Sequence, residues 1–313
     1  MLEGIASKTR QMNRSTPDLS SITVRTVAVE RLADSAFLTQ LVDEALRTYQ
    51  NTLALSRSAL ANSVLVTPVL VKDDASPTVE ERGHGLRLVL QWAVNQLAPA
   101  PPAFPLGVFR PLDDPTWRDP LWWRYNILRH RYLEPLHPDD FVGGGRFTET
   151  LLALTGISSA DAFFDERNRA IHEVAEWLRR QLLDDAYSGE LQQLAIQEAL
   201  APVKRHSQAG QLLAMAAIFD DVFAREQLLE LARRKDIDRA EQVLDDVIAG
   251  RFLLTDDGGA NLWLSPVLRA YLYARQPTGE MQRRHRLIAA RNEAEGRLLP
   301  AVRHHQRGGD DGS

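Results

Sequence analysis

The chain has 313 residues, a formal net charge of −5 and no cysteine. Its length exceeds that of the usual single domain, so we expect two or three modules. The absence of cysteine excludes disulfides, thiolate zinc sites and a cysteine nucleophile. No apolar run approaches the roughly 20 residues of a membrane helix, and no signal-peptide core opens the chain. We therefore expect a cytoplasmic protein with no membrane partner.

The first third of the chain is predicted to be helical. Residues 1–20 are polar and have few apolar side chains, which predicts a disordered tail. From residue 24 onward apolar side chains recur at spacings of three to five, which indicates helices. Residues 79–97 form the clearest of them. The apolar and β-branched segment 56–71 is ambiguous, because a strand fits it as well and Pro68 interrupts either structure. We favour a helix there, up to about residue 67.

Six prolines between residues 99 and 115 predict an extended connection, because proline lacks a backbone donor and crowds the preceding turn. A ligand for an aromatic-lined recognition groove is the alternative. Trp117, Trp122 and Trp123 lie at the end of this stretch. We expect the three indoles to pack in the core, and a platform for stacking bases is the alternative.

The middle of the chain has the pattern of a helix-turn-helix. Gly156 stands where a left-handed residue would end a short helix over 148–154. Ser158 stands where a side-chain oxygen would cap the next helix, over 159–183. Ile157 lies between them and can fill the angle between the two helices. Such motifs often carry DNA binding.

The motifs ILRHRYLEPL, LLALTGIS and FFDERNRAIHEVAEWLRRQL resemble region four of sigma factors and the related helix-turn-helix units of bacterial regulators. In that family the helix after the turn is the recognition helix. The resemblance implies that the residues at the turn and along the start of that helix lie near the major groove of DNA. These are Ser158, Ser159, Asp161, Ala162 and Arg167, with Arg169 as a further cation that could face DNA.

Two features depart from the family pattern. The loop before the short helix carries an extra Gly143-Gly144-Gly145-Arg146, and residues 121–183 contain eight arginines against nine acids. Phosphate contacts supply most of the affinity for DNA, and acids on a recognition helix oppose it. A module that keeps its fold but no longer binds DNA is therefore the alternative.

The second half predicts three helices and a hairpin, which together make a winged helix. The helices cover 208–219, 223–234 and 237–249, and the strands cover 252–255 and 261–264. The Asp-Asp-Gly-Gly between the strands is typical of a tight hairpin turn. A calcium loop is the alternative, but the distal glutamate of an EF-hand is missing.

This segment resembles the winged helix of STAND-type signalling ATPases, through LLAMAAIFDDVFAREQLLELA and AEQVLDDVIAGRFLLTDDGGANLWLSPVLRAYLYAR. In those proteins the winged helix packs against the ATPase and acts as a switch, rather than binding DNA. No P-loop lysine motif occurs in this chain. The resemblance therefore implies a winged-helix module without the ATPase domain.

A last helix is predicted over 278–299, with Arg283, Arg284 and Arg286 clustered on it. Residues 269–307 contain nine arginines against three acids. Such a patch can bind phosphates or an acidic partner, and a solvated helix face is the alternative.

The predicted fold class is mainly α, with an N-terminal helical bundle, a helix-turn-helix module and a C-terminal winged helix with one short β-hairpin. The predicted units are a disordered tail (1–20), a helical region (21–98), a Pro-rich linker (99–120), the helix-turn-helix module (121–185), the winged-helix module (190–299) and a second disordered tail (300–313).

The pattern of modules predicts a bacterial DNA-binding or transcription-regulatory protein. The alternative is a non-enzymatic adaptor for protein–protein interactions in a signalling or defence system. No nucleophile, nucleotide or metal motif occurs, so we predict no catalytic residue, no cofactor and no metal. DNA and a protein are the expected partners, and a homo-oligomer is compatible with both hypotheses.

Overall fold

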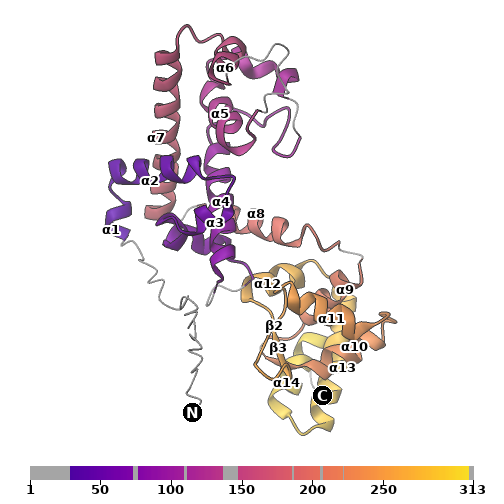
Figure 1. Cartoon of the computed structure of the whole chain (residues 1–313). Coiled ribbons are helices and arrows are strands. Elements are labelled where there is room, and N and C mark those ends of the chain that lie inside the picture. The colour runs from indigo at the N-terminus through magenta and orange to yellow at the C-terminus, as the bar shows by residue number, and fades with distance from the viewer. Residues whose placement is uncertain are drawn as a thin grey trace, which may run out of the picture.

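A computed structural model of the chain describes residues 29–72, 77–108, 111–136, 147–184, 187–204, 207–220 and 222–309. The protein is mainly helical, with one small antiparallel sheet in its C-terminal part, so the mainly α class is confirmed. Figure 1 shows an N-terminal body (29–204) and a C-terminal module (207–309), with α8 running from the first toward the second. The predicted tail at 1–20 and the glycine loop at 143–146 lie outside the described residues.

The N-terminal body consists of α-helices, short 3₁₀ turns and one π-helical turn. In chain order these are α1 (Val29–Leu32), α2 (Ser35–Arg47), α3 (Thr52–Ser56), η2 (Leu60–Asn62), η3 (Val64–Val69), α4 (Val79–Asn95), η4 (Pro111–Asp113), η5 (Pro115–Arg118), α5 (Trp123–Leu128), η6 (Arg129–Leu133, the π-helical turn), α6 (Phe147–Thr155), α7 (Ala160–Asp184) and α8 (Ser188–Leu200).

Helix α4, which the periodicity of residues 79–97 predicts, packs against α3, α7 and α8. Thr78 and Glu81 form a reciprocal capping box at its start, so two orphan N–H groups of the helix are satisfied. Trp92 packs against Trp177 of α7 and Tyr187 beside α8, with ring centroids 6.4 and 5.5 Å away. These aromatic contacts join α4, α7 and α8 into one core.

The segment 56–71 does not continue as the helix that its composition favours. The helix α3 stops at Ser56, and the chain continues through the 3₁₀ turns η2 and η3, with Pro68 inside the second. The second turn packs closely on α4, because a Cβ at Gly85 of α4 would lie 2.6 Å from Cγ1 of Val66 in η3. The chain thus packs on α4 through 3₁₀ turns where its composition favours a helix.

The tryptophans after the proline-rich stretch pack as predicted. Trp117 and Trp122 are buried, and the Trp123 indole N–H donates to the Trp117 carbonyl at 3.1 Å. The proline-rich stretch itself packs on α5 and η6, because the guanidinium of Arg129 donates to the Phe104 and Pro105 carbonyls. Its carbonyls therefore help to hold a cation that is almost completely buried.

The predicted turn between α6 and α7 is present. Gly156 has a φ of +72°, the left-handed conformation that glycine adopts without a Cβ penalty, and Ile157 is buried beneath the turn. The cap of α7 differs from the prediction by one residue. The Ser159 hydroxyl, rather than that of Ser158, accepts the N–H of Ala162 at 3.1 Å.

The C-terminal module contains six helices and three short strands in its described residues. They are α9 (Gln208–Ala216), β1 (Phe223–Ala224), α10 (Arg225–Arg233), α11 (Ala240–Ala249), β2 (Leu254–Thr255), β3 (Asn261–Trp263), α12 (Pro266–Ala274), α13 (Thr278–Ala294) and α14 (Leu298–Gly308).

The sheet extends the predicted hairpin by one strand. Strands β2 and β3 pair antiparallel through a turn in which Asp256 accepts the N–H groups of Ala260 and Asn261 at 3.0 and 3.2 Å. Strand β1 adds to the other edge of β3, with Phe223 opposite Leu262, so the strand order is β1-β3-β2. Residues 223 and 224 were expected to begin a helix; α10 begins at Arg225 instead.

The expected disordered tail over 300–313 is wrong for its first part, because residues 298–308 form α14. The expected helix over 278–299 ends at Ala294, and Gly296, with a φ of +73°, reverses the chain. Helix α14 then packs back on α13, with Ala301 buried and the Arg286 side chain donating to the carbonyl of Gly308 at 2.9 Å. Contacts with α13 therefore stabilise a helix that its own sequence does not predict.

Lys72 connects the N-terminal body to the C-terminal module. Its ammonium donates to the Gly250 carbonyl at 2.9 Å and lies 4.2 Å from the ring centroid of Phe252. Beside it, the Ser265 hydroxyl at the cap of α12 donates to the Val71 carbonyl. The junction thus uses backbone carbonyls from both parts.

Glu81 makes a second connection across the same junction. One carboxylate oxygen accepts the Thr78 N–H at 2.8 Å within the capping box, and the other accepts from the Arg251 guanidinium at 3.0 Å. Arg251 itself has a left-handed φ of +56°.

No helix in the described part of the chain is long and apolar enough to cross a membrane.

Candidate functional site

The residues predicted to lie at the major groove are found at one end of α7. Ser158, Ser159 and Asp161 are exposed there, and Ala162 is half-buried. The Ser159 hydroxyl is already used as the helix cap. The four residues therefore lie at the turn that the sequence predicts, but Ala162 packs partly into the core beneath it.

Arg167 does not belong to this surface. Its side chain is buried, with the residue only 8% exposed, and its guanidinium donates to the Tyr132 hydroxyl at 2.7 Å, to Asp43 and to Asn168 at 2.9 Å. These bonds connect α7 to α2 and η6. The expectation that Arg167 reaches DNA is corrected accordingly: it holds the N-terminal body together.

Arg169 is exposed, but it is paired on its own helix. Its guanidinium donates to Glu166 at 2.7 Å, and Glu166 also accepts from Arg124 of α5 at 3.1 Å. Asp161 and Asp165 are exposed on the same half of α7. The outer surface at the start of α7 therefore presents more carboxylate than cation, which opposes contact with phosphates.

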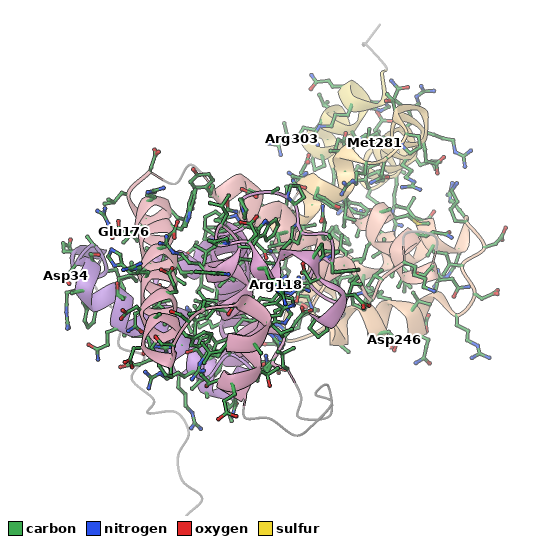
Figure 2. The ribbon with its side chains drawn as sticks, turned by 90° about the horizontal axis from the view of Figure 1, so that it is seen from above. Asp34, Arg118, Glu176, Asp246, Met281 and Arg303 are labelled. Carbon is green, nitrogen blue, oxygen red and sulfur yellow. The ribbon has the colours of Figure 1, made fainter. Side chains whose placement is uncertain are left out.

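Helix α11 presents an acidic surface in the C-terminal module. It carries Glu241, Asp245 and Asp246, all exposed, and no lysine or arginine. Arg225 pairs with Asp245 at 2.6 Å from outside the helix. In Figure 2, Asp246 lies at one margin of the module, while Met281 of α13 and Arg303 of α14 lie at the opposite margin.

The hairpin turn beside α11 adds to this acidic character. Asp257 is exposed there, and Asp256 is partly exposed. Hydrogen bonds from the Asn261 side chain and backbone lower the pKa of Asp256, so its carboxylate stays ionised. We call Glu241, Asp245, Asp246, Asp256 and Asp257 the acidic surface of the module.

The three arginines predicted as a basic patch on α13 do not share one surface. Arg283 is exposed. The side chain of Arg284 is 12% exposed; it pairs with Glu280 at 3.1 Å and donates to the Gln276 amide oxygen at 2.6 Å. Arg286 is bonded to the end of α14. The patch is corrected to Arg283 with Arg286 beside it, and Arg284 belongs to the interior of the module.

Arg284 and Glu280 line a groove of about 910 Å³ between the end of α8 and helices α9, α12 and α13. Glu280 also pairs with Lys235 at 2.7 Å, and this hydrogen bond lowers the pKa of Glu280. Burial lowers the pKa of Arg284. Sequence reasoning missed this groove, because its lining comes from segments between residues 200 and 284 that share no local spacing.

Two histidines are buried between α13 and α14. The Nδ1 atoms of His285 and His304 lie 2.7 Å apart, and His285 Nε2 lies 3.0 Å from the Tyr273 hydroxyl. Burial lowers the pKa of His285 to about 4 and also lowers that of His304. Both rings are therefore neutral at pH 7, and they hold α14 on α13.

No family model, no curated protein and no solved structure matches this chain. Within the described residues no cluster of three histidine or acidic side chains is arranged to hold a metal ion.

Proposed function

We propose that this protein is a non-enzymatic adaptor whose C-terminal module is a winged helix that binds a basic surface of a partner protein. The order α9-β1-α10-α11-β2-β3, with β1 paired to the far strand of a hairpin, supports the winged-helix assignment. In this arrangement α11 takes the position of the recognition helix and the turn at 256–259 takes that of the wing.

The observation that carries the proposal is the acidic surface on that helix and wing. A helix that enters a DNA groove lies among phosphates, whose binding depends on lysine and arginine. Helix α11 offers carboxylates instead, and the wing repeats them. Complementary potentials steer protein partners together, so a surface of this sign favours a lysine- or arginine-rich partner.

The α6–α7 pair is further evidence for an adaptor rather than a DNA-binding protein. We infer that it keeps the shape of a helix-turn-helix, with Gly156 at the turn and Ser159 at the cap. Arg167, the arginine expected near the major groove, is bonded to Tyr132 inside the N-terminal body. The exposed cation Arg169 is paired with Glu166. The pair therefore serves as a structural support of the N-terminal body.

Charge reversal on α11 tests the proposal. Full-length protein with Glu241→Lys and Asp246→Lys should lose partners that the wild-type protein retains from a lysate at about 0.1 M salt, where exposed charges still interact at roughly 10 Å. Asp184→Lys with Glu190→Lys makes the same change of charge on exposed positions of α7 and α8 and should retain them. Partners identified by mass spectrometry should present basic surfaces. Equal retention by both variants would contradict the proposal.

DNA binding through α13 is the second candidate, favoured by the excess of arginines after residue 269 and by the exposure of Arg283. Fluorescence anisotropy with labelled random-sequence duplexes at low salt decides it. Binding that weakens steeply with salt and is reduced by Arg283→Glu would support DNA as the partner. We expect no binding at any salt concentration.

A further inference from the structure

The groove between α8 and the C-terminal module has mainly apolar walls. Its volume of about 910 Å³ is in the range of small-molecule sites. The apolar lining comes from the end of α8, from α9 and from the α12–α13 connection: Leu200, Val203, Leu213, Met215, Leu272 and Pro277. A ligand with an apolar body can therefore bury most of its surface here.

Part of the groove lining is polar and carries a surplus of positive charge. Lys235 and Arg284 both contact Glu280, at 2.7 and 3.1 Å, so two cations share one carboxylate. The guanidinium of Arg284 is also fixed by Gln276, whose own amide donates to the Ala214 carbonyl at 2.7 Å. The side chain of Lys235 is 37% exposed and can turn toward a ligand.

Lys235 and Arg284 share the single carboxylate of Glu280, so they can bind one further negative charge. Arg284 stays ionised because a guanidinium is not deprotonated in proteins. Since burying an uncompensated charge is costly, an anion in the groove would be favoured over a neutral group of the same shape. Arg275, stacked 3.8 Å from the ring centroid of Tyr271, adds a further cation to the wall.

We propose that this groove is a binding site for an amphipathic carboxylate, a monoanion with an apolar tail. The tail lies along Leu200, Val203 and Leu272, which are partly exposed, and the carboxylate pairs with Lys235 beside Arg284. Leu200 and Val203 belong to the segment that leads out of α8, so the ligand would contact the connection between body and module as well as the module. This proposal is independent of the adaptor function and of the acidic surface.

Isothermal titration calorimetry of the full-length protein with decanoate tests the site, and 1-decanol is the matched ligand that keeps the tail without the charge. We expect decanoate to bind at least tenfold more tightly than 1-decanol, because a charge-assisted hydrogen bond contributes a factor of this order. Absence of decanoate binding, or equal affinity for the two, would overturn the proposal.

Protein variants locate the site. Lys235→Gln should weaken decanoate about tenfold and leave 1-decanol unchanged. Arg234→Gln, which removes one charge from the neighbouring residue outside the groove lining, should change neither. Leu200→Trp should exclude both ligands by filling the groove, and Val203→Trp repeats that test if the first variant unfolds. Unchanged affinity in Lys235→Gln, or in both tryptophan variants when folded by circular dichroism, would place the ligand elsewhere and refute the proposal.

Discussion

The guanidinium of Arg167 donates to the hydroxyl oxygen of Tyr132 at 2.7 Å and to the carboxylate of Asp43, so three segments of the N-terminal body meet at one side chain. Arg167 stands on α7, Tyr132 on η6 and Asp43 on α2. The residue that resembles a DNA-reading arginine in the sequence is thus a structural connection in the fold.

Removing that connection should destabilise the protein. Arg167→Ala removes the bonds to Asp43 and to the Tyr132 hydroxyl. Asp43 is partly exposed and keeps its pair with Arg47, so the loss is about 2 kcal/mol. We expect a decrease of this size in the free energy of unfolding, measured by urea denaturation followed by circular dichroism. Arg169→Ala, on the exposed side of the same helix, should change it by less than about 0.5 kcal/mol. Equal effects of the two variants would contradict the structural role.

Gly156 and Gly189 allow the effect of backbone conformation on stability to be separated from that of steric clashes. A Cβ would meet nothing within 4 Å at Gly156 or at Gly189, but only Gly156 has a left-handed φ. Gly156→Ala should therefore destabilise by about 1 kcal/mol through backbone strain. Gly189→Ala, in the first turn of α8, should be neutral or stabilising by up to about 1 kcal/mol. Thermal unfolding of the two variants measures this difference.

Acid should weaken the protein through its buried imidazoles. Burial lowers the pKa of His285 to about 4 in the folded state, below the ordinary value of 6.5. Between pH 6.5 and 4 the unfolded chain therefore binds a proton that the folded chain does not. The contribution of His285 to the free energy of unfolding is fully present above pH 6.5 and falls as the pH drops toward 4. Below pH 4 it is constant, after a total loss of about 3 kcal/mol.

Urea denaturation at pH 7 and pH 5 measures this dependence. His130, whose pKa burial also lowers to about 4, adds to it with the same sign. His285→Phe should reduce the pH dependence, whereas His84→Phe, at an exposed position of α4, should leave it as in the wild type. A pH dependence that is unchanged in His285→Phe would contradict the assignment.

Lys72 should control how firmly the module is held on the body. Lys72→Met removes the hydrogen bond to Gly250 and the cation–π contact with Phe252, together about 1 to 2 kcal/mol. We expect faster hydrogen exchange at residues 250–265 and unchanged exchange in α2. Lys204→Met provides the control, since Lys204 is exposed after α8. Equal exchange in the two variants would show that Lys72 does not hold the junction.

Local stereochemistry could be predicted from the sequence. The turn at Gly156 and the hairpin turn at Asp256 follow from residues that are neighbours in the chain, and both are found. Strand β1 could not be predicted, because its two residues are a strand only through pairing with β3, 38 positions later. Helix α14 likewise depends on its contacts with α13.

Burial of the candidate residues was less predictable for the same reason. The sequence pattern shows that Arg167 is a cation near a helix start, but Tyr132 and Asp43, which enclose it, come from other segments. Arg283 and Arg284 are adjacent, yet their side chains have different surroundings. Arg283 is exposed, whereas the guanidinium of Arg284 meets the Ala214 carbonyl of α9 and the Gln276 amide after α12. Helical phase alone does not show which side is covered.

Glu81 couples the start of α4 to the C-terminal module. Because the same carboxylate completes the cap of α4 and holds Arg251 of the module, forming either interaction orders the side chain for the other. Such coupling is reciprocal in free energy. A change that loosens the module should therefore fray the first turn of α4, and a weaker cap at Thr78 should lower the affinity of the body for the module.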